Sequence, residues 1–237
     1  MWISGDKMKY NKNIYKAEFI SRPNRFNAKV LLNNEEITVH VPNTGRCREI
    51  LQAGCTVYLR EELNPTRKTK YDLVAAIKED MLISIDSQIP NKVVKEALEN
   101  RAVDKLVEYT NILSEKTFGN SRFDFKLSKD NGEEYYLEVK GVTLEDEGHC
   151  RFPDAPTERG KKHLLELIDV KESGRGAGVL FLIQIEGIKS FSPNSDTDPE
   201  FAYALKTAKD KGVDIFAYSC IVKEDEITLD KAVEVLF

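Results

Sequence analysis

Residues 121–142 read SRFDFKLSKDNGEEYYLEVKGV. Two runs in which apolar and polar residues alternate flank a turn-forming segment, and this period of two is typical of β-strands. In the first run Phe123, Phe125 and Leu127 share one face, and Asp124 lies on the opposite face. The stretch therefore predicts two neighbouring strands with an acidic group on their polar side.

The second run carries the residues that give this polar side a chemistry. Leu137 and Val139 face the core, whereas Glu138 and Lys140 point the other way. If the two runs form a hairpin, Asp124, Glu138 and Lys140 converge. Two carboxylates can hold Mg²⁺ or Mn²⁺ for phosphodiester cleavage, and the lysine can orient water or stabilise developing charge. A solvated sheet face with paired surface charges would show the same pattern, so the spacing leaves both readings open.

The length of the turn decides whether the carboxylates meet. A two-residue loop, Asn131-Gly132, would place them on opposite faces of the hairpin. A three-residue loop, Asp130-Asn131-Gly132, pairs Asp124 with Glu138 and matches the apolar faces of the two strands. We therefore predict a type I turn with Gly132 at positive φ and a bulge.

The residues before this region read as a small β-barrel. Short strand-like runs are separated by turn residues, and a helical turn or two is expected over Gly45–Gln52. Such an order is typical of an OB-like barrel, with an SH3-like barrel as the alternative that propensity cannot separate. The expected strands are Lys16–Ile20, Asn27–Leu32, Ile37–Val41, Thr56–Glu61, Leu73–Lys78 and Met81–Ile85.

The rest of the chain reads as a second, mixed α/β domain. Ser87–Asn91 is a plausible link because Pro90 suits the first turn of a helix, which we expect to run to about Arg101. We place the domains at residues 1–86 and 87–237. The second domain is expected to continue with strands at Asn111–Thr117, Ser121–Ser128 and Glu134–Val142, a loop at Glu145–Pro156, a helix at Thr157–Lys171, a strand at Val179–Glu186, a helix at Pro199–Lys211 and a strand at Asp214–Ile221.

Composition and charge set broad limits on function. Met1–Lys12 is polar, and the longest apolar run, Val179–Ile183, is too short to span a bilayer, so a cytoplasmic protein is expected. The four cysteines form no C-x-x-C pair and suit neither a zinc site nor a disulfide framework. The net charge is −5, but residues 1–86 carry 14 Lys and Arg against 11 Asp and Glu. A basic bias in the first domain permits binding to nucleic acid.

Six motifs resemble one known family over nearly the whole chain, from about Ile14 to Val235. That family is the sugar fermentation stimulation protein A family. The motifs are long and specific. One departure is that Phe123 precedes Asp124, where the PD-(D/E)XK nuclease signature often has proline. The six motifs are RPNRF at 22–26, HVPNTGRC at 40–47, RKTKYDL at 67–73, SRFDF at 121–125, LEVKGVT at 137–143 and FPDAPTERG at 152–160.

This resemblance implies a DNA-binding protein with an OB-like first domain and a second domain similar to PD-(D/E)XK nucleases, which are restriction-endonuclease-like. It assigns Asp124 and Glu138 as metal ligands, Lys140 as the catalytic lysine, and Glu96 as an additional acid on the preceding helix. RNA remains possible as a substrate, and the oligomeric state is undetermined. The family name also suggests a rival, a non-catalytic DNA-binding regulator of sugar metabolism on a nuclease-like fold. A sugar-binding barrel has no supporting feature beyond that name.

Several other residues are candidates for contacts at the site. Phe26 could stack on a base, next to cations that grip phosphate, although surface cations around a core aromatic would look the same. Gln184 could reach the site from the adjacent strand, and the alternative is an amide whose hydrogen bonds are satisfied within the protein. The histidines His40, His149 and His163 are scattered and support no metal site or catalytic triad. The candidate phosphate contacts are Arg22, Arg25, Arg46, Arg67 and Lys68, and the candidate cleft residues are Asp154, Glu158 and Arg159.

Overall fold

The computed structural model describes residues 9, 10 and 12–237. Most of the polar N-terminal segment used above for localisation therefore lies outside the described residues. In the described residues, no helix is both long and apolar enough to cross a bilayer.

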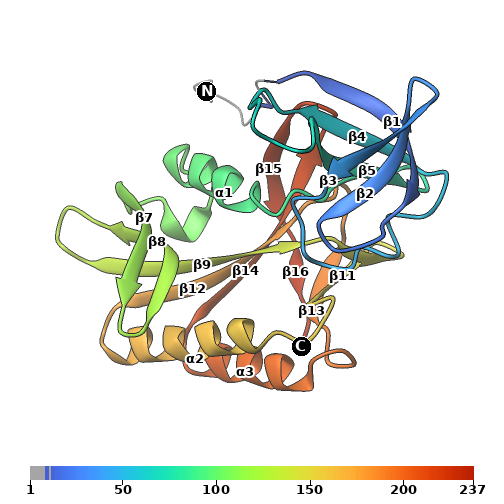
Figure 1. Cartoon of the computed structure of the whole chain (residues 1–237). Helices are drawn as coiled ribbons and strands as arrows, with labels where there is room; N and C mark the ends of the chain where they lie inside the picture. Colours follow the sequence, from blue (N-terminus) through green and yellow to red (C-terminus); the bar gives the residue numbers. More distant parts are fainter. Residues whose placement is uncertain (1–8, 11) are drawn as a thin grey trace.

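The first domain is a closed barrel made of short strands, with tight turns after β2 and β5 and longer loops between the other strands (Figure 1). Strand β1 pairs with β2 and β4, β2 pairs with β3, and β4 pairs with β5. A parallel bridge between His40 and Asp72 joins β3 to β5 and closes the barrel, which confirms the predicted OB-like fold. The strands are β1 (Ile14–Ser21), β2 (Asn27–Leu32), β3 (Glu35–His40), β4 (Thr56–Glu61), β5 (Tyr71–Lys78) and β6 (Met81–Ser84).

The helical turn predicted for residues 45–52 is present as one turn, in which the amides of Leu51 and Ile50 both donate to the carbonyl of Cys47. Two local features prevent a longer helix there. The backbone of Cys47 has φ +45°, and the amide of Gly45 is bonded to the side chain of Asn43.

The second domain is built on a six-stranded mixed sheet in the order β15-β14-β12-β9-β8-β7. Helix α1 packs against one face of this sheet, and helices α2 and α3 lie side by side on the other (Figure 1). The sheet strands are β7 (Asn111–Phe118), β8 (Ser121–Ser128), β9 (Glu134–Val142), β12 (Gly176–Ile183), β14 (Asp214–Val222) and β15 (Ile227–Ala232). The helices are α1 (Pro90–Glu99), the short 3-10 helix η1 (Asp104–Leu106), α2 (Glu158–Glu172) and α3 (Pro199–Asp210).

A small second sheet lies next to the barrel and was not expected from the sequence. Its order is β10-β11-β13-β16, and two of its strands occupy the segment predicted as a loop. The strands are short and contain residues with turn propensity, which hides them in the sequence. β10 and β11 pair with each other as a small hairpin, whereas β13 and β16 join the sheet from distant parts of the chain. The strands are β10 (Leu144–Asp146), β11 (His149–Phe152), β13 (Ser190–Pro193) and β16 (Glu234–Val235).

The barrel and the second domain share one continuous apolar core. Barrel residues such as Val39 and Leu59 belong to the same buried cluster as Phe181 and Phe201 beneath helices α2 and α3. A partly buried ion pair between Lys78 and Glu145, with Nζ and Oε2 2.7 Å apart, also joins the domains. The two domains therefore present fixed surfaces to each other.

The hairpin between β8 and β9 has the predicted register from Phe125 to Ser128, but the predicted pairing of Asp124 with Glu138 is not formed. Phe125 lies opposite Leu137, and a three-residue loop connects the strands. Gly132 ends this loop with φ +87°, and its amide donates to the carbonyl of Lys129. Apolar side chains therefore lie opposite apolar side chains across the hairpin, as predicted from the alternation of the two strands.

The predicted faces of β8 are correct except at Phe123. Phe125 packs on the α1 side of the sheet, whereas Phe123 packs on the α2 side against Tyr136 and His163. The alternation breaks at Asp124, because the β8–β9 ladder ends at Phe125. Beyond that point the amide of Val139 is bonded to the carboxylate of Asp124 in place of a backbone carbonyl.

The turn gives a test of the register. Alanine in place of Gly132 should lower the free energy of unfolding by about 1 kcal/mol, because a Cβ is strained at φ +87°. No atom lies within 4 Å of an added Cβ, so the loss would be conformational. Urea unfolding should show a smaller loss for Gly132→Asn, since asparagine tolerates this region. Equal losses for the two variants would contradict the assigned turn.

Candidate active site

Asp124 lies where β8 separates from β9, between the sheet and helix α1. Its Oδ2 accepts a hydrogen bond from the amide of Val139 at 2.8 Å, and its Oδ1 accepts one from Asn91 Nδ2 at 2.7 Å. These bonds fix both oxygens of the carboxylate beside strand β9. Burial, together with the negative charge of Glu138, raises the pKa of Asp124 above its ordinary value.

Glu138 is buried on β9 and is held from two sides. Its Oε1 accepts from Lys140 Nζ at 2.6 Å and pairs with Nδ1 of His163. Burial opposes ionisation, but the bond to His163 and the charge of Lys140 outweigh it and lower the pKa of Glu138. The second oxygen, Oε2, is buried and has no hydrogen-bond partner. A buried carboxylate oxygen without a partner is costly unless a cation or donor can reach it.

The ligand atoms of the site, carboxylate oxygens, are of the type that a hard divalent cation prefers. Asp124 and Glu138 provide two carboxylates, and Oε2 of Glu138 has no hydrogen-bond partner. Within the described residues no group of three or more Asp, Glu, His or Cys side chains is placed to hold a metal ion. Mg²⁺ is commonly held by one or two carboxylates, with water and phosphate oxygens as the remaining ligands.

His163 is a residue of the site that the sequence did not reveal. It lies on α2, whose buried residues Gly160, His163, Leu164 and Leu167 follow a helical period. That periodicity was the available signal, since it places His163 on the inner face. What faces it there is Glu138, 25 residues earlier in the chain, and only the packing of α2 against β9 makes the contact.

Helix α1 reaches Asp124 through Asn91. Asn91 lies in the first turn and donates to the carboxylate, whereas Glu96 lies five residues further along the helix. Five residues are nearly one and a half turns, so the two side chains leave the helix in different directions. Glu96 is half-buried, and its role as an additional acid remains a prediction.

A cavity of about 360 Å³ opens beside Asp124 at the junction of the two domains. The barrel contributes Asn43, Thr44 and Gly45, and the second domain contributes residues of α1, β9 and the loop after β11. Two of the cleft candidates are part of this junction. Asp154 accepts a hydrogen bond from the amide of Arg46, and Gln184 is buried in the cavity wall. Glu158 and Arg159 instead line a separate cavity next to His163.

Two of the predicted phosphate contacts are already engaged inside the protein. Arg22 donates to four backbone carbonyls, those of Arg25, Asn43, Gly45 and Arg46. Arg67 is paired with Asp72 and Glu62. Both side chains therefore organise loops of the barrel, and neither is placed as a free surface cation.

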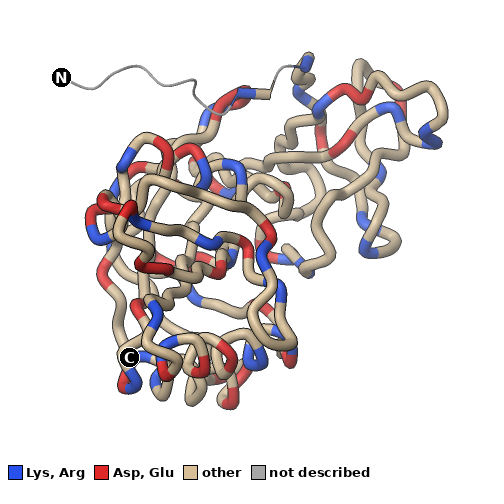
Figure 2. The backbone as a smooth tube through the Cα atoms, turned by 90° about the vertical axis from the view of Figure 1, so that its left-hand side faces the viewer, with Lys and Arg blue, Asp and Glu red and all other residues tan. Residues whose placement is uncertain are grey.

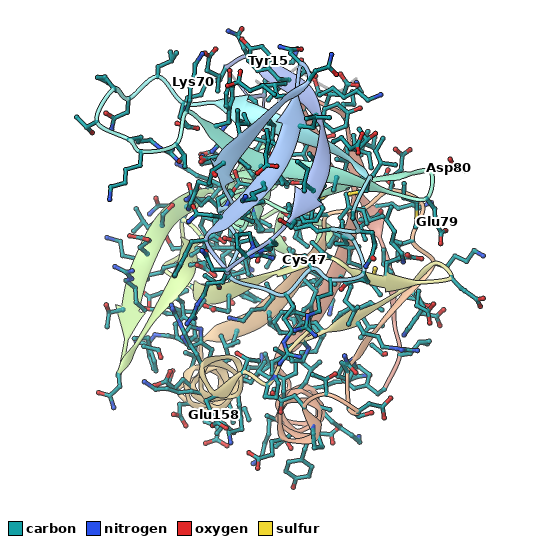
Figure 3. The ribbon with its side chains drawn as sticks, turned by 45° about the vertical axis from the view of Figure 1, so that its right-hand side comes forward. Tyr15, Cys47, Lys70, Glu79, Asp80 and Glu158 are labelled. Atoms are coloured by element: carbon teal, nitrogen blue, oxygen red, sulfur yellow. The ribbon has the colours of Figure 1, made fainter. Side chains whose placement is uncertain are left out.

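The other three predicted contacts are exposed. Arg25 lies over the ring of Phe26, with 5.4 Å from its guanidinium carbon to the ring centroid, and that ring is 53% exposed. Arg22 holds the carbonyls of both Arg25 and Arg46, so these two arginines stand on loops that it joins. Lys68 is in the loop before β5. Figure 3 shows Lys70 of that loop far from Cys47, which lines the cavity.

Comparison with known proteins identifies the family. A family profile described as the sugar fermentation stimulation protein RE domain matches residues 88–226, and one described as the SfsA N-terminal OB domain matches residues 20–85. The chain belongs to the SfsA family. A sugar fermentation stimulation protein homolog of Clostridium perfringens is 65% identical over 229 residues, which are 97% of this chain and all of that protein. A homolog of Clostridium botulinum is 67% identical over 228 residues, covering 96% of this chain and 99% of that protein.

A solved structure of the SfsA family has the same fold throughout. It is described as the structure of Pyrococcus furiosus SfsA in complex with Ca²⁺, and its sequence is 27% identical. The two structures superpose with a TM-score of 0.87 over 97% of this chain and all of that one. The chain is thus an OB domain joined to a restriction-endonuclease-like α/β domain.

The repulsion between the two carboxylates can be measured as stability. Asp124→Asn should raise the free energy of unfolding at pH 7, since it removes a buried negative charge beside Glu138. Asn91 can turn its amide and keep the hydrogen bond. Because the folded state raises the pKa of Asp124 above its ordinary value of 3.8, its ionisation destabilises the fold as the pH rises above that value.

The gain should therefore disappear below about pH 3.8, where the parent carboxyl is protonated in both states. Thermal unfolding in buffer with EDTA measures this difference, with Asp80→Asn in an exposed turn as the matched control. A loss of stability at pH 7 would show that the carboxylate of Asp124 does not oppose folding.

Proposed function

We propose that this SfsA protein binds nucleic acid and hydrolyses phosphodiester bonds with Mg²⁺ or Mn²⁺ held by Asp124 and Glu138. The observation that carries the proposal is the buried Oε2 of Glu138, which has no partner although it lies in a site with a second carboxylate and a lysine. A module that only bound nucleic acid would have no use for two carboxylates directed at a phosphate, since like charges repel.

The chain's own residues would divide the work. Asp124 is fixed by Asn91 and Val139, so its carboxylate needs little reorganisation to act as a ligand. Glu138 is oriented through Oε1, which leaves Oε2 free. A bound Mg²⁺ would activate water and neutralise charge on the phosphate. Lys140, on the same strand, would orient the water or stabilise charge on the phosphate oxygens.

A cation in the structure of a relative supports the choice of a divalent metal. The Pyrococcus furiosus SfsA structure is described as a complex with Ca²⁺, which prefers the same oxygen ligands. We expect Ca²⁺ to occupy the carboxylates of this chain without supporting turnover.

The OB domain supports nucleic acid as the partner, DNA in the first place and RNA as an alternative. OB domains bind single strands by stacking bases on aromatic side chains and by gripping the backbone with cations. Near the domain junction the aromatic side chain is that of Phe26, and the cations are Arg25 and Arg46. Lys68 supplies a more distant positive charge. Elsewhere Lys and Arg alternate with Asp and Glu over both domains (Figure 2), so binding is expected to depend on these few positions.

Cleavage tests the proposal directly. Labelled single- and double-stranded DNA and RNA should be cut in Mn²⁺ or Mg²⁺ and remain intact in Ca²⁺ or EDTA. Asp124→Asn, Glu138→Gln and Lys140→Ala should each reduce the rate about 10²-fold or more. Affinity should separate the variants, because the first two remove negative charge near the phosphate and the third removes a cation. The first two should bind equally or more tightly, and Lys140→Ala more weakly.

If the parent cuts none of these substrates, or if Asp124→Asn cuts as fast as the parent, the nuclease assignment is wrong. Binding without metal-dependent cleavage would favour the non-catalytic regulator.

Salt dependence tests the contacts of the barrel. Arg25→Ala, Arg46→Ala and Lys68→Ala should each lower the slope of log K against log salt by roughly one on duplex DNA. Arg22→Ala should instead lower stability, since its guanidinium holds four carbonyls. Slopes equal to that of the parent for all three exposed cations would exclude this face of the barrel.

A further inference from the structure

The cavity at the domain junction lies next to Asp124, because two residues that hydrogen-bond to Asp124 line it. Asn91 and Val139, both bonded to Asp124, line it, and so does Gly141, which follows Lys140 on β9. Its volume of about 360 Å³ lies at the lower end of the range for small-ligand pockets, roughly 300–1,000 Å³. A group bound there would be adjacent to a phosphate held at Asp124 and Glu138.

Glycine keeps part of the wall of this cavity open. A Cβ added to Gly141 would lie 2.9 Å from Cγ of Pro90 and 3.5 Å from Nε2 of Gln184. On the barrel side, a Cβ on Gly45 would lie 2.9 Å from Oδ2 of Asp154. Larger side chains at these positions would press on the neighbouring walls of the cavity.

Gln184 has an unused hydrogen-bonding group in the cavity wall. The residue is 2% exposed, and its Oε1 is buried without a partner. Its backbone is fixed on both sides, since its amide donates to Val142 O at 3.0 Å and its carbonyl accepts from Ser84 N at 3.2 Å. A buried amide oxygen held in place without a donor is destabilising on its own and is suited to accept a hydrogen bond from a ligand.

The other walls of the cavity indicate the chemistry of that ligand. Phe152, Pro153 and Pro156 supply an apolar side, and the charges are one cation, Arg151, and one anion, Asp154. The side-chain amide of Asn43 is already engaged by the backbone, because it donates to Ile85 O and accepts from Gly45 N. A half-apolar pocket with one unpartnered amide oxygen, that of Gln184, and little net charge does not suit a phosphate. It suits a heterocycle whose edge bears hydrogen-bond donors and acceptors.

We propose that this cavity receives one unpaired nucleobase of the substrate, with the amide of Gln184 bonded to the edge of the base. The inference rests on the proposed function, because it takes the adjacent phosphate to be the one cleaved. It assigns a substrate class, since a base can enter only from a single strand, a frayed end or a distorted duplex. Cleavage would then occur beside an unpaired nucleotide.

Binding without metal tests the pocket independently of cleavage. The probes are two ten-nucleotide strands in EDTA, one with abasic residues throughout and one with a single 2-aminopurine among them. The parent should bind the strand with the base roughly tenfold more tightly, as expected for one enclosed base. Gln184→Met keeps the size of the side chain and removes the amide, so it should lose most of this preference while binding the abasic strand like the parent.

Two measurements exclude a trivial loss of structure. Gln184→Met should unfold at the same temperature as the parent or higher, since it removes an unpartnered oxygen, and Gln52→Met on the exposed barrel surface serves as control. In the parent itself, binding should protect the 2-aminopurine from quenching by acrylamide. This second readout needs no variant.

Equal affinity of the parent for the two strands, or a base that stays open to acrylamide, would overturn the pocket. A preference that survives Gln184→Met would overturn the role of Gln184. If the preference is found but no substrate is cut in Mn²⁺, the pocket stands and the nuclease assignment fails.

Discussion

The position of β9 between β8 and β12 is the constraint on which the candidate site depends. Antiparallel pairing with β8 sets Leu137 opposite Phe125, and parallel pairing with β12 sets Glu138 opposite Val179. A shift of one residue in either ladder would turn Glu138 toward helix α1 and bring Leu137 to the polar side. The apolar residues on the two faces of β9 therefore fix the direction of its charged residues.

The same strand leads to the cavity. The β9–β12 ladder ends where Val142 meets Ile183, and the next residue of the second strand is Gln184. Its amide continues the ladder by bonding to Val142 O, while its carbonyl accepts from Ser84 in the barrel. The junction of the domains is thus an extension of the sheet. Arg46 and Asp154 add a second connection, and the shared core keeps the cavity between fixed walls.

The electrostatics of the site oppose the stability of the fold at Asp124, whose pKa is raised, and favour it at Glu138, whose pKa is lowered. Asp124 is partly buried beside another carboxylate, and Glu138 is ionised in a buried position only because His163 and Lys140 bond to it. Hydrogen bonds from Asn91 and Val139 offset only part of the effect of burial on Asp124, whose pKa remains raised. The surrounding structure therefore holds negative charge where burial alone would remove it, as expected where a cation or a phosphate complex is to be bound.

The sequence by itself determined the local elements and the main residues proposed for the site. Alternation over 121–142 and the matching of apolar faces predicted the hairpin, its three-residue loop and the positive φ of Gly132, because these depend on neighbours in the chain. The barrel followed from short alternating runs and turn residues. Tertiary structure alone decided the rest. His163 contacts Glu138 through the packing of helix α2 on the sheet. Arg22 donates hydrogen bonds to carbonyls of a loop more than 20 residues away in the chain. Gln184 lines a cavity that both domains form. Periodicity assigns a side chain to a face, but its partners come from distant segments, and those are set by how the faces pack together.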